Sequence, residues 1–172
     1  MKRFMLFLSL ILVVLLNMDI SFAQSTKEAI RSLQKLQAKT EVGISYRDYV
    51  SVLGDAKFEV NLFLQSRQAK NDKLADSIMQ AMEHYQMAKT VWQVKIDKMY
   101  LGRLPSVSNF IFVDNEDDKE LIDLNSLFRR YPNIKNEIRK GPMGRDIHIE
   151  TAIQIIWAEA NKELKKAITL LP

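Results

Sequence analysis

Apolar residues recur every three or four positions along most of this chain, which is the spacing of amphipathic α-helices. The most regular stripe is Leu74, Ile78, Ala81, Tyr85, Ala88, Trp92 and Ile96. Similar stripes predict helices over residues 25–41, 45–67, 72–98, 117–131 and 146–170. The expected fold class is all-α: an antiparallel bundle of four long helices plus one short helix, with a long irregular connection before the last helix.

Polar residues and glycines mark the expected ends of the first helices. Ser25 with Glu28, and Ser45 with Asp48, have the spacing of N-terminal caps. Gly43 separates the two helices, as a glycine commonly does after a helix. The helix over residues 45–67 is apolar on more than one side, which predicts a central position in the bundle.

The connection from Leu101 to Arg145 is long for a helical bundle, and long connections on a rigid scaffold often carry function. Its apolar run Phe110–Val113 has no other strand candidate to pair with. We therefore expect that run to be a loop over the bundle, with the charged part of the connection facing outward. This segment is the expected contact region.

The first 23 residues have the pattern of a cleaved secretory signal peptide. Lys2 and Arg3 precede an apolar run that ends at Leu16, shorter than the roughly 20 residues of a membrane-spanning helix. Small residues at Ser21 and Ala23 favour cleavage before residue 24. Residues 24–172 then form a single helical domain, expected in the periplasm or outside the cell.

The charge balance excludes some classes of partner. Without Lys2, Arg3 and Asp19, the 25 basic and 21 acidic residues become 23 and 20, a net charge of +3. This balance is too mild to predict nucleic-acid binding, which needs a concentrated basic surface. After leader cleavage no apolar run is long enough to span a membrane.

Motifs for chemistry are scarce in this chain. It has no cysteine and two histidines, His84 and His148, and neither lies in a zinc or di-iron motif. Asp114, Glu116 and Asp118 alternate as in a calcium loop, but the required glycine and the closing glutamate are missing. No catalytic, cofactor-binding or metal-binding residue is assigned, and no cofactor is expected. Haem held by a histidine and one of eight methionines stays open.

Two polar residues fall within the apolar face predicted for residues 45–67. Lys57 lies in angle between apolar neighbours, and Asn61 follows one turn later. A buried lysine must find a partner or lower its pKa, and such groups often mark functional sites. The structural alternative is an ion pair with a neighbouring helix, or an aliphatic stem buried beneath a solvated amine.

A cluster of positive residues lies toward the end of the long connection. It contains Arg129, Arg130, Lys135, Arg139, Lys140 and Arg145. These residues are candidates for a surface that contacts an anionic polymer or an acidic envelope protein. An ordinary solvated surface is the alternative.

Two runs, Gly43–Tyr49 and Leu53–Glu59, resemble a stretch of small exported all-helical bacterial proteins that have no assigned function. The resemblance extends to Trp92 and the turn at residues 131–133. It implies an exported bacterial protein and supplies no activity, cofactor or catalytic residue.

These observations favour an exported, non-catalytic helical protein that acts as an interaction or binding module in the cell envelope. A ligand- or metal-binding bundle is the alternative. An enzyme that uses Lys57 with Asp55 or Glu59 is a third, disfavoured because the lysine and the two acids point in different directions on the helix.

Overall fold

The computed structural model describes residues 25–65, 73–141 and 144–171 of the chain. The leader predicted over residues 1–23 lies outside the described residues, as does the expected end of the second helix after residue 65. None of the helices in the described ranges is long and apolar enough to cross a membrane.

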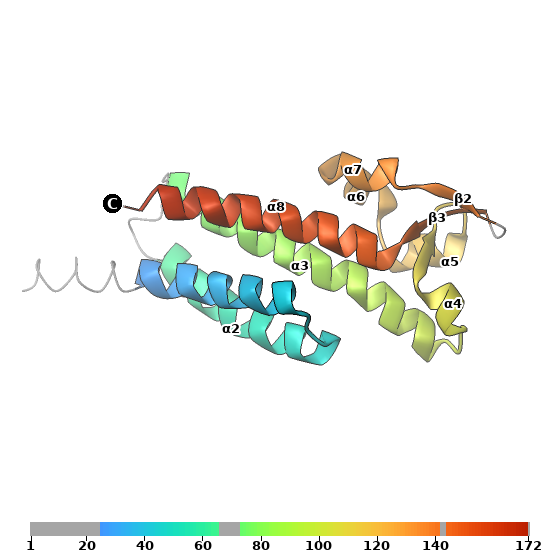
Figure 1. Cartoon of the computed structure of the whole chain (residues 1–172), viewed down its shortest axis with the longest axis horizontal. Coiled ribbons are helices and arrows are strands. Elements are labelled where there is room, and N and C mark those ends of the chain that lie inside the picture. Colours follow the sequence, from blue (N-terminus) through green and yellow to red (C-terminus); the bar gives the residue numbers. More distant parts are fainter. Residues whose placement is uncertain (1–24, 66–72, 142–143, 172) are drawn as a thin grey trace, which may run out of the picture.

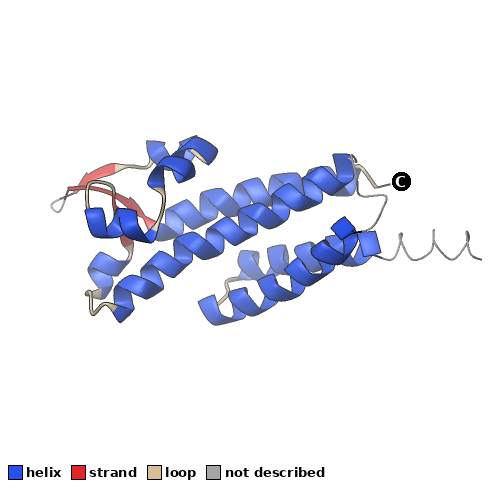
Figure 2. Ribbon diagram, turned by 180° about the vertical axis from the view of Figure 1, so that it is seen from behind, coloured by secondary structure: helices blue, strands red, loops and turns tan. Residues whose placement is uncertain are grey.

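Helices make up most of the described chain (Figures 1 and 2). The four long helices are residues 25–42, α2 (Tyr46–Gln65), α3 (Lys73–Tyr100) and α8 (Ile149–Thr169). The short elements between α3 and α8 are α4 (Pro105–Ser108), β1 (Phe110–Phe112), α5 (Glu116–Leu121), α6 (Leu124–Arg130), α7 (Pro132–Asn136), β2 (Arg139–Gly141) and β3 (Gly144–His148). The predicted all-α class is confirmed, with a small sheet added.

The long helices run alongside one another with alternating direction, and the short elements gather at one end (Figure 1). The pair α3 and α8 packs along most of its length, and α2 packs against α3. Fully buried alanines at Ala81, Ala88 and Ala160 let the backbones approach closely. The buried core combines residues from all four long helices with residues from the sheet and from α6 and α7.

The predicted start and stop signals around residue 43 are confirmed. Gly43 has a φ of 92°, a conformation that glycine adopts without a steric penalty, directly after the helix that ends at residue 42. The Asp48 amide donates to Ser45 Oγ at 3.1 Å, which satisfies one free N–H at the start of α2.

The prediction that α2 is central and buried on more than one side is wrong. Its buried residues form a single face: Tyr49, Leu53, Ala56, Val60 and Phe63. Phe58 and Leu62 on the outer side are 61% and 45% exposed. The sequence pattern counted every apolar position as buried, although single exposed apolar side chains are common on protein surfaces.

The prediction of a loop at Phe110–Val113 is also wrong, because residues 110–112 form β1. This strand pairs antiparallel with β3, and Ile111 lies opposite Ile147 in the register. β2 pairs with the other edge of β3. The last helix therefore begins at Ile149 instead of residue 146. A strand of three to five residues has too few positions to show a period, so its partner was not recognised.

The short helix predicted over residues 117–131 is two helices, α5 and α6. Ile122 and Asp123 separate them in extended conformation. Asp123 Oδ1 accepts hydrogen bonds from the amides of Asn125 and Ser126 at 3.0 and 3.1 Å, so this residue begins a new helix. Because Asp123 caps the start of α6, the helix is not continuous from α5 to α6.

Aromatic side chains join three of the long helices. The rings of Tyr49, Trp92 and Trp157 lie 5.6–6.0 Å apart. The Trp157 indole N–H donates to the Tyr49 hydroxyl at 3.1 Å, and that hydroxyl donates to the Tyr85 carbonyl at 2.8 Å. Burial of these polar groups is therefore compensated, as aromatic residues in a core require.

Replacing Tyr85 by alanine is expected to lower the free energy of unfolding by about 3–5 kcal/mol, since the ring is fully buried and its removal leaves a cavity. Tyr85→Phe retains the ring and removes only the hydroxyl that donates to Asn161 Oδ1 at 2.6 Å, a loss of about 1 kcal/mol. Urea unfolding measures both variants. Equal losses would contradict this account of the core.

Candidate functional site

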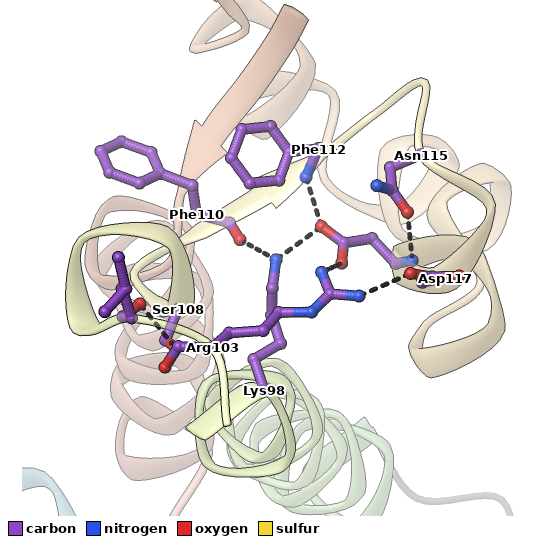
Figure 3. Close-up of polar contacts among 9 residues, drawn as sticks. Lys98, Arg103, Ser108, Phe110, Phe112, Asn115 and Asp117 are labelled. Atoms are coloured by element: carbon purple, nitrogen blue, oxygen red, sulfur yellow. Dashed lines mark hydrogen bonds and ion pairs between the residues drawn. The ribbon is translucent and has the colours of Figure 1, made fainter. Parts of the chain in front are cut away.

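A fully buried lysine stands in the last turn of α3, where the short elements meet the bundle. The side chain of Lys98 has no exposed surface. Its Nζ donates to Asp118 Oδ2 at 2.6 Å and to the Phe110 carbonyl at 2.5 Å (Figure 3). The ammonium also lies 4.9 Å from the centre of the Phe112 ring. A positive charge near a helix C-terminus is favoured by the helix dipole.

Asp118 is the partner that makes burial of Lys98 tolerable. It stands in the first turn of α5, and its side chain is also fully buried. Its Oδ2 accepts a second hydrogen bond from the Phe112 amide at 2.7 Å, and its own amide donates to Asn115 Oδ1 at 3.3 Å. One carboxylate thus joins α3, β1 and α5.

Arg103 closes the cluster on its outer side. Its guanidinium donates to Asp118 Oδ1 at 3.2 Å and to Asp117 Oδ2 at 2.7 Å (Figure 3). Burial lowers the pKa of Lys98, and the carboxylate of Asp118 opposes that shift. A buried amine whose protons are engaged in this way positions backbone and is not accessible as a catalytic group.

Four large apolar side chains lie directly outside this buried cluster, and we call them the apolar tip. Met99, Tyr100, Leu101 and Leu104 are 49%, 86%, 66% and 69% exposed. They occupy the end of α3 and the turn that follows, at the end of the molecule where the sheet lies (Figure 1).

The backbone of the apolar tip is fixed at both ends. The Arg103 amide donates to the Lys98 carbonyl and the Gly102 amide to the Met99 carbonyl, both at 3.1 Å. Gly102 has a φ of 74°, which a side chain would strain. Because Lys98 and Arg103 are held by Asp118, the tip residues between them are presented in one conformation.

The expected outward-facing arrangement of the Leu101–Arg145 segment holds only in part. Ile111 and Phe112 are buried against the bundle, as expected of its apolar part. Leu101 and Leu104, however, face outward, and the acidic Asp118 faces inward. Ile111 and Phe112 are buried because β1 pairs with β3 and packs on the bundle. No part of the described chain covers Leu101 and Leu104 in the same way.

The prediction that Lys57 and Asn61 are buried is wrong, since both are exposed. At about 100° per residue, Lys57 lies about 80° from the middle of the buried face of α2, beyond its edge. The proposed catalytic use of Lys57 with Asp55 or Glu59 loses its basis. A buried lysine does exist, but it is Lys98.

The six basic candidates are all exposed, but they do not form one free cationic surface. They are spread over α6, α7 and the β2–β3 hairpin: Arg129, Arg130, Lys135, Arg139, Lys140 and Arg145. Arg145 binds both oxygens of Asp114 at 3.0 and 2.5 Å, and Arg130 binds Glu83 at 2.7 Å. Anion binding by the remaining residues stays a prediction.

The alternating acids near residue 114 do not converge on a cation. Asp118 turns inward to Lys98, and Asp114 pairs with Arg145. Across the ranges that the structure describes, no group of three or more His, Cys, Asp or Glu side chains could hold a metal ion.

A second buried polar pair joins α3 to the junction of α6 and α7. His84 Nδ1 and the Tyr131 hydroxyl are 2.6 Å apart, and both residues are buried. Burial lowers the pKa of His84, and the nearby guanidinium of Arg130 lowers it further, whereas Glu159, Glu163 and Glu83 oppose this. Burial also raises the pKa of Tyr131 to about 12.

Sequence reasoning missed the Lys98–Asp118 pair, although one signal was present. Lys98 lies seven residues after Val91 and four after Val94, so it continues a buried face of α3. Asp118 gave a misleading signal, because acids in a first turn usually face solvent and complement the helix dipole.

No protein-family model matches this chain, and no curated protein or solved structure matches it significantly. The resemblance to small exported bacterial proteins therefore stays a prediction. The fold and the buried cluster define a helical protein with an apolar tip held by an internal ion pair.

Replacing Asp118 by asparagine is expected to lower the free energy of unfolding by about 3–5 kcal/mol, because Lys98 keeps its charge without a counter-charge. Asp117→Asn is the matched control: this neighbouring acid is 70% exposed and also binds Arg103, so its loss should cost at most about 1 kcal/mol.

The double variant Lys98→Met/Asp118→Asn removes the unpaired charge and keeps an oxygen for the Phe112 amide. Chemical denaturation should show a smaller loss for it than for Asp118→Asn alone. The single variant Lys98→Met completes the cycle. If the loss of the double variant equals the sum of the two single losses, the two charges do not interact.

The stability of the fold should fall as the pH is lowered through the range where His84 titrates. Its folded pKa lies below the ordinary value of 6.5, so between these two values the unfolded chain binds more protons. The contribution is fully present above about pH 6.5 and is lost as the pH falls toward the folded pKa.

Urea unfolding at several pH values tests this expectation. His84→Gln should lose stability less steeply than the parent chain below pH 6.5. The same slope in both chains would show that another group is responsible.

Proposed function

We propose that this chain is an exported, non-catalytic interaction module that binds a partner macromolecule through its apolar tip. The observation that carries the proposal is the exposure of four large apolar side chains within residues 99–104, at one end of the molecule. A concentration of exposed apolar side chains marks interaction sites more often than single exposed residues do.

The other exposed large apolar residues of the described chain do not suggest an equal site. They are Val42, Phe58, Leu62, Leu170 and Leu171. Phe58 and Leu62 are two side chains on the outer face of α2, and Val42 stands at a helix end. In the apolar tip, four exposed apolar residues follow closely in the chain, and hydrogen bonds at Gly102 and Arg103 hold its backbone.

The buried ion pair supports the proposal through preorganisation. A binding loop that is already ordered loses less conformational entropy when it meets its partner. The side chains of Lys98 and Asp118 have no exposed surface. They make four hydrogen bonds: one to each other, two to backbone groups of β1 and one to Arg103. Ordering of the tip is therefore achieved before binding.

The leader pattern supports the exported part of the proposal, because residues 1–16 combine a positive start with a short apolar run. The buried polar groups of His84, Lys98 and Trp157 are each engaged with another side chain of the protein, which supports a non-catalytic role.

A photoreactive benzoyl-phenylalanine at Leu101 tests the proposal in cells that export the chain. Irradiation is expected to give a discrete cross-linked product, and the recovered chain is expected to begin at Gln24. The same group at Phe58, which is also exposed, is the matched control. Equal cross-linking at the two positions would refute a specific role of the tip.

A further inference from the structure

The charge around the apolar tip is opposite in sign to that of the whole chain. Residues 95–123, which contain the tip and the cluster beneath it, carry four basic and seven acidic residues. Residues 129–148 carry six basic and two acidic residues, and the whole chain has a net charge of +4. The tip therefore lies in an acidic part of a basic protein.

Burial of the cations strengthens this local acidity. Lys98 has no exposed surface, and the side chain of Arg103 is only 21% exposed. By contrast, the side chains of Asp117 and Glu116 are 70% and 81% exposed. Lys98 and Arg103 therefore add little positive charge to the surface, whereas the more exposed Lys119 pairs with Glu116.

Asp117 lies next to the tip because the buried cluster brings it there, and Glu116 precedes it in the same first turn of α5. Asp118 fixes the first turn of α5 against Lys98, and Asp117 reaches Arg103, which lies between tip residues in the chain (Figure 3). Surface ion pairs such as that of Glu116 with Lys119 are weak and can exchange with a partner's cation.

A second copy of the chain does not suit this surface. Four side chains expose on the order of a few hundred Å², below the roughly 800 Å² per partner of a stable interface. Two tips facing each other would also bring the same acids together, which is unfavourable. An anionic lipid surface would meet the same repulsion.

From the combination of an apolar centre with acidic flanks we infer that the partner is a cationic amphipathic peptide segment, in which Lys or Arg residues flank apolar anchors. This inference rests on the proposed function and adds the chemistry of the partner. Apolar side chains of the segment contact Tyr100, Leu101 and Leu104, and its cations contact Glu116, Asp117 and Glu120. Complementary charge fixes the orientation and excludes acidic segments.

Three short synthetic amphipathic peptides test the inference with the purified chain: one of leucine and lysine, one of leucine and glutamate, and one of leucine and glutamine. Isothermal titration or fluorescence anisotropy gives each dissociation constant. The lysine peptide should bind at least about tenfold more tightly than the glutamate peptide, with an affinity that falls as salt is added.

Variants of the chain separate the apolar contribution from the charge. Leu101→Ser/Leu104→Ser should weaken binding of the lysine peptide by about tenfold or more, whereas Phe58→Ser should leave it unchanged. Glu116→Gln/Glu120→Gln should weaken the lysine peptide and reduce its salt dependence, while Asp118 and the buried cluster stay intact.

Two outcomes would overturn the inferred partner chemistry. Equal binding of all three peptides that is lost in Leu101→Ser/Leu104→Ser would leave the tip as a binding site and remove the role of charge. Failure of the lysine peptide to bind, or stronger binding to vesicles of phosphatidylcholine and phosphatidylglycerol than to the peptide, would also overturn it. Cross-linking from Leu101 judges the proposed function separately.

Discussion

The contact between the Lys98 ammonium and the Asp118 carboxylate is the buried polar link between the long helices and the short elements at the end of the bundle. It connects the end of α3 to the start of α5 and, through the Phe110 carbonyl and the Phe112 amide, to β1. Two buried charges are costly to remove from water, and the cost is offset only when geometry and hydrogen bonding are good. Apolar residues of the short elements, such as Ile111 and Ile134, also enter the core, and the ion pair adds a fixed polar geometry where α3, β1 and α5 meet.

The arrangement divides the molecule into two physically different parts. Along the four long helices, stability comes from apolar stripes and from aromatic residues such as Tyr49 and Trp157, whose polar groups bond to each other. At the end with the sheet, the charged side chains of Lys98 and Asp118 are also fully buried, and they bind each other. A rigid bundle thus presents an end whose shape is fixed by polar geometry, which suits a surface for recognition.

Exposure of Tyr100, Leu101 and Leu104 beside buried Lys98 reverses the usual distribution of apolar and charged residues. The reversal follows from the end of α3. The helix must end there, its last turn favours a cation, and the short strand β1 supplies a carbonyl for that cation. The apolar residues that follow are then directed outward. A partner that covers them would remove their apolar surface from water, which the fold alone does not do.

The sequence by itself determined the helical class, the position of α3 to within two residues at either end, the caps at Ser45 and Gly43, and the core placement of Tyr85 and Trp157. These follow from local preferences and from a period repeated over many turns. Only the tertiary structure decided that Lys57 and Asn61 face solvent, that Lys98 and Asp118 meet, and that residues 110–112 pair with residues 146–148. Each of these depends on contacts between segments that are distant in the sequence. The angular position of Lys57 on its helix does not say which segment will cover that face. A strand of three residues likewise does not say which segment will pair with it.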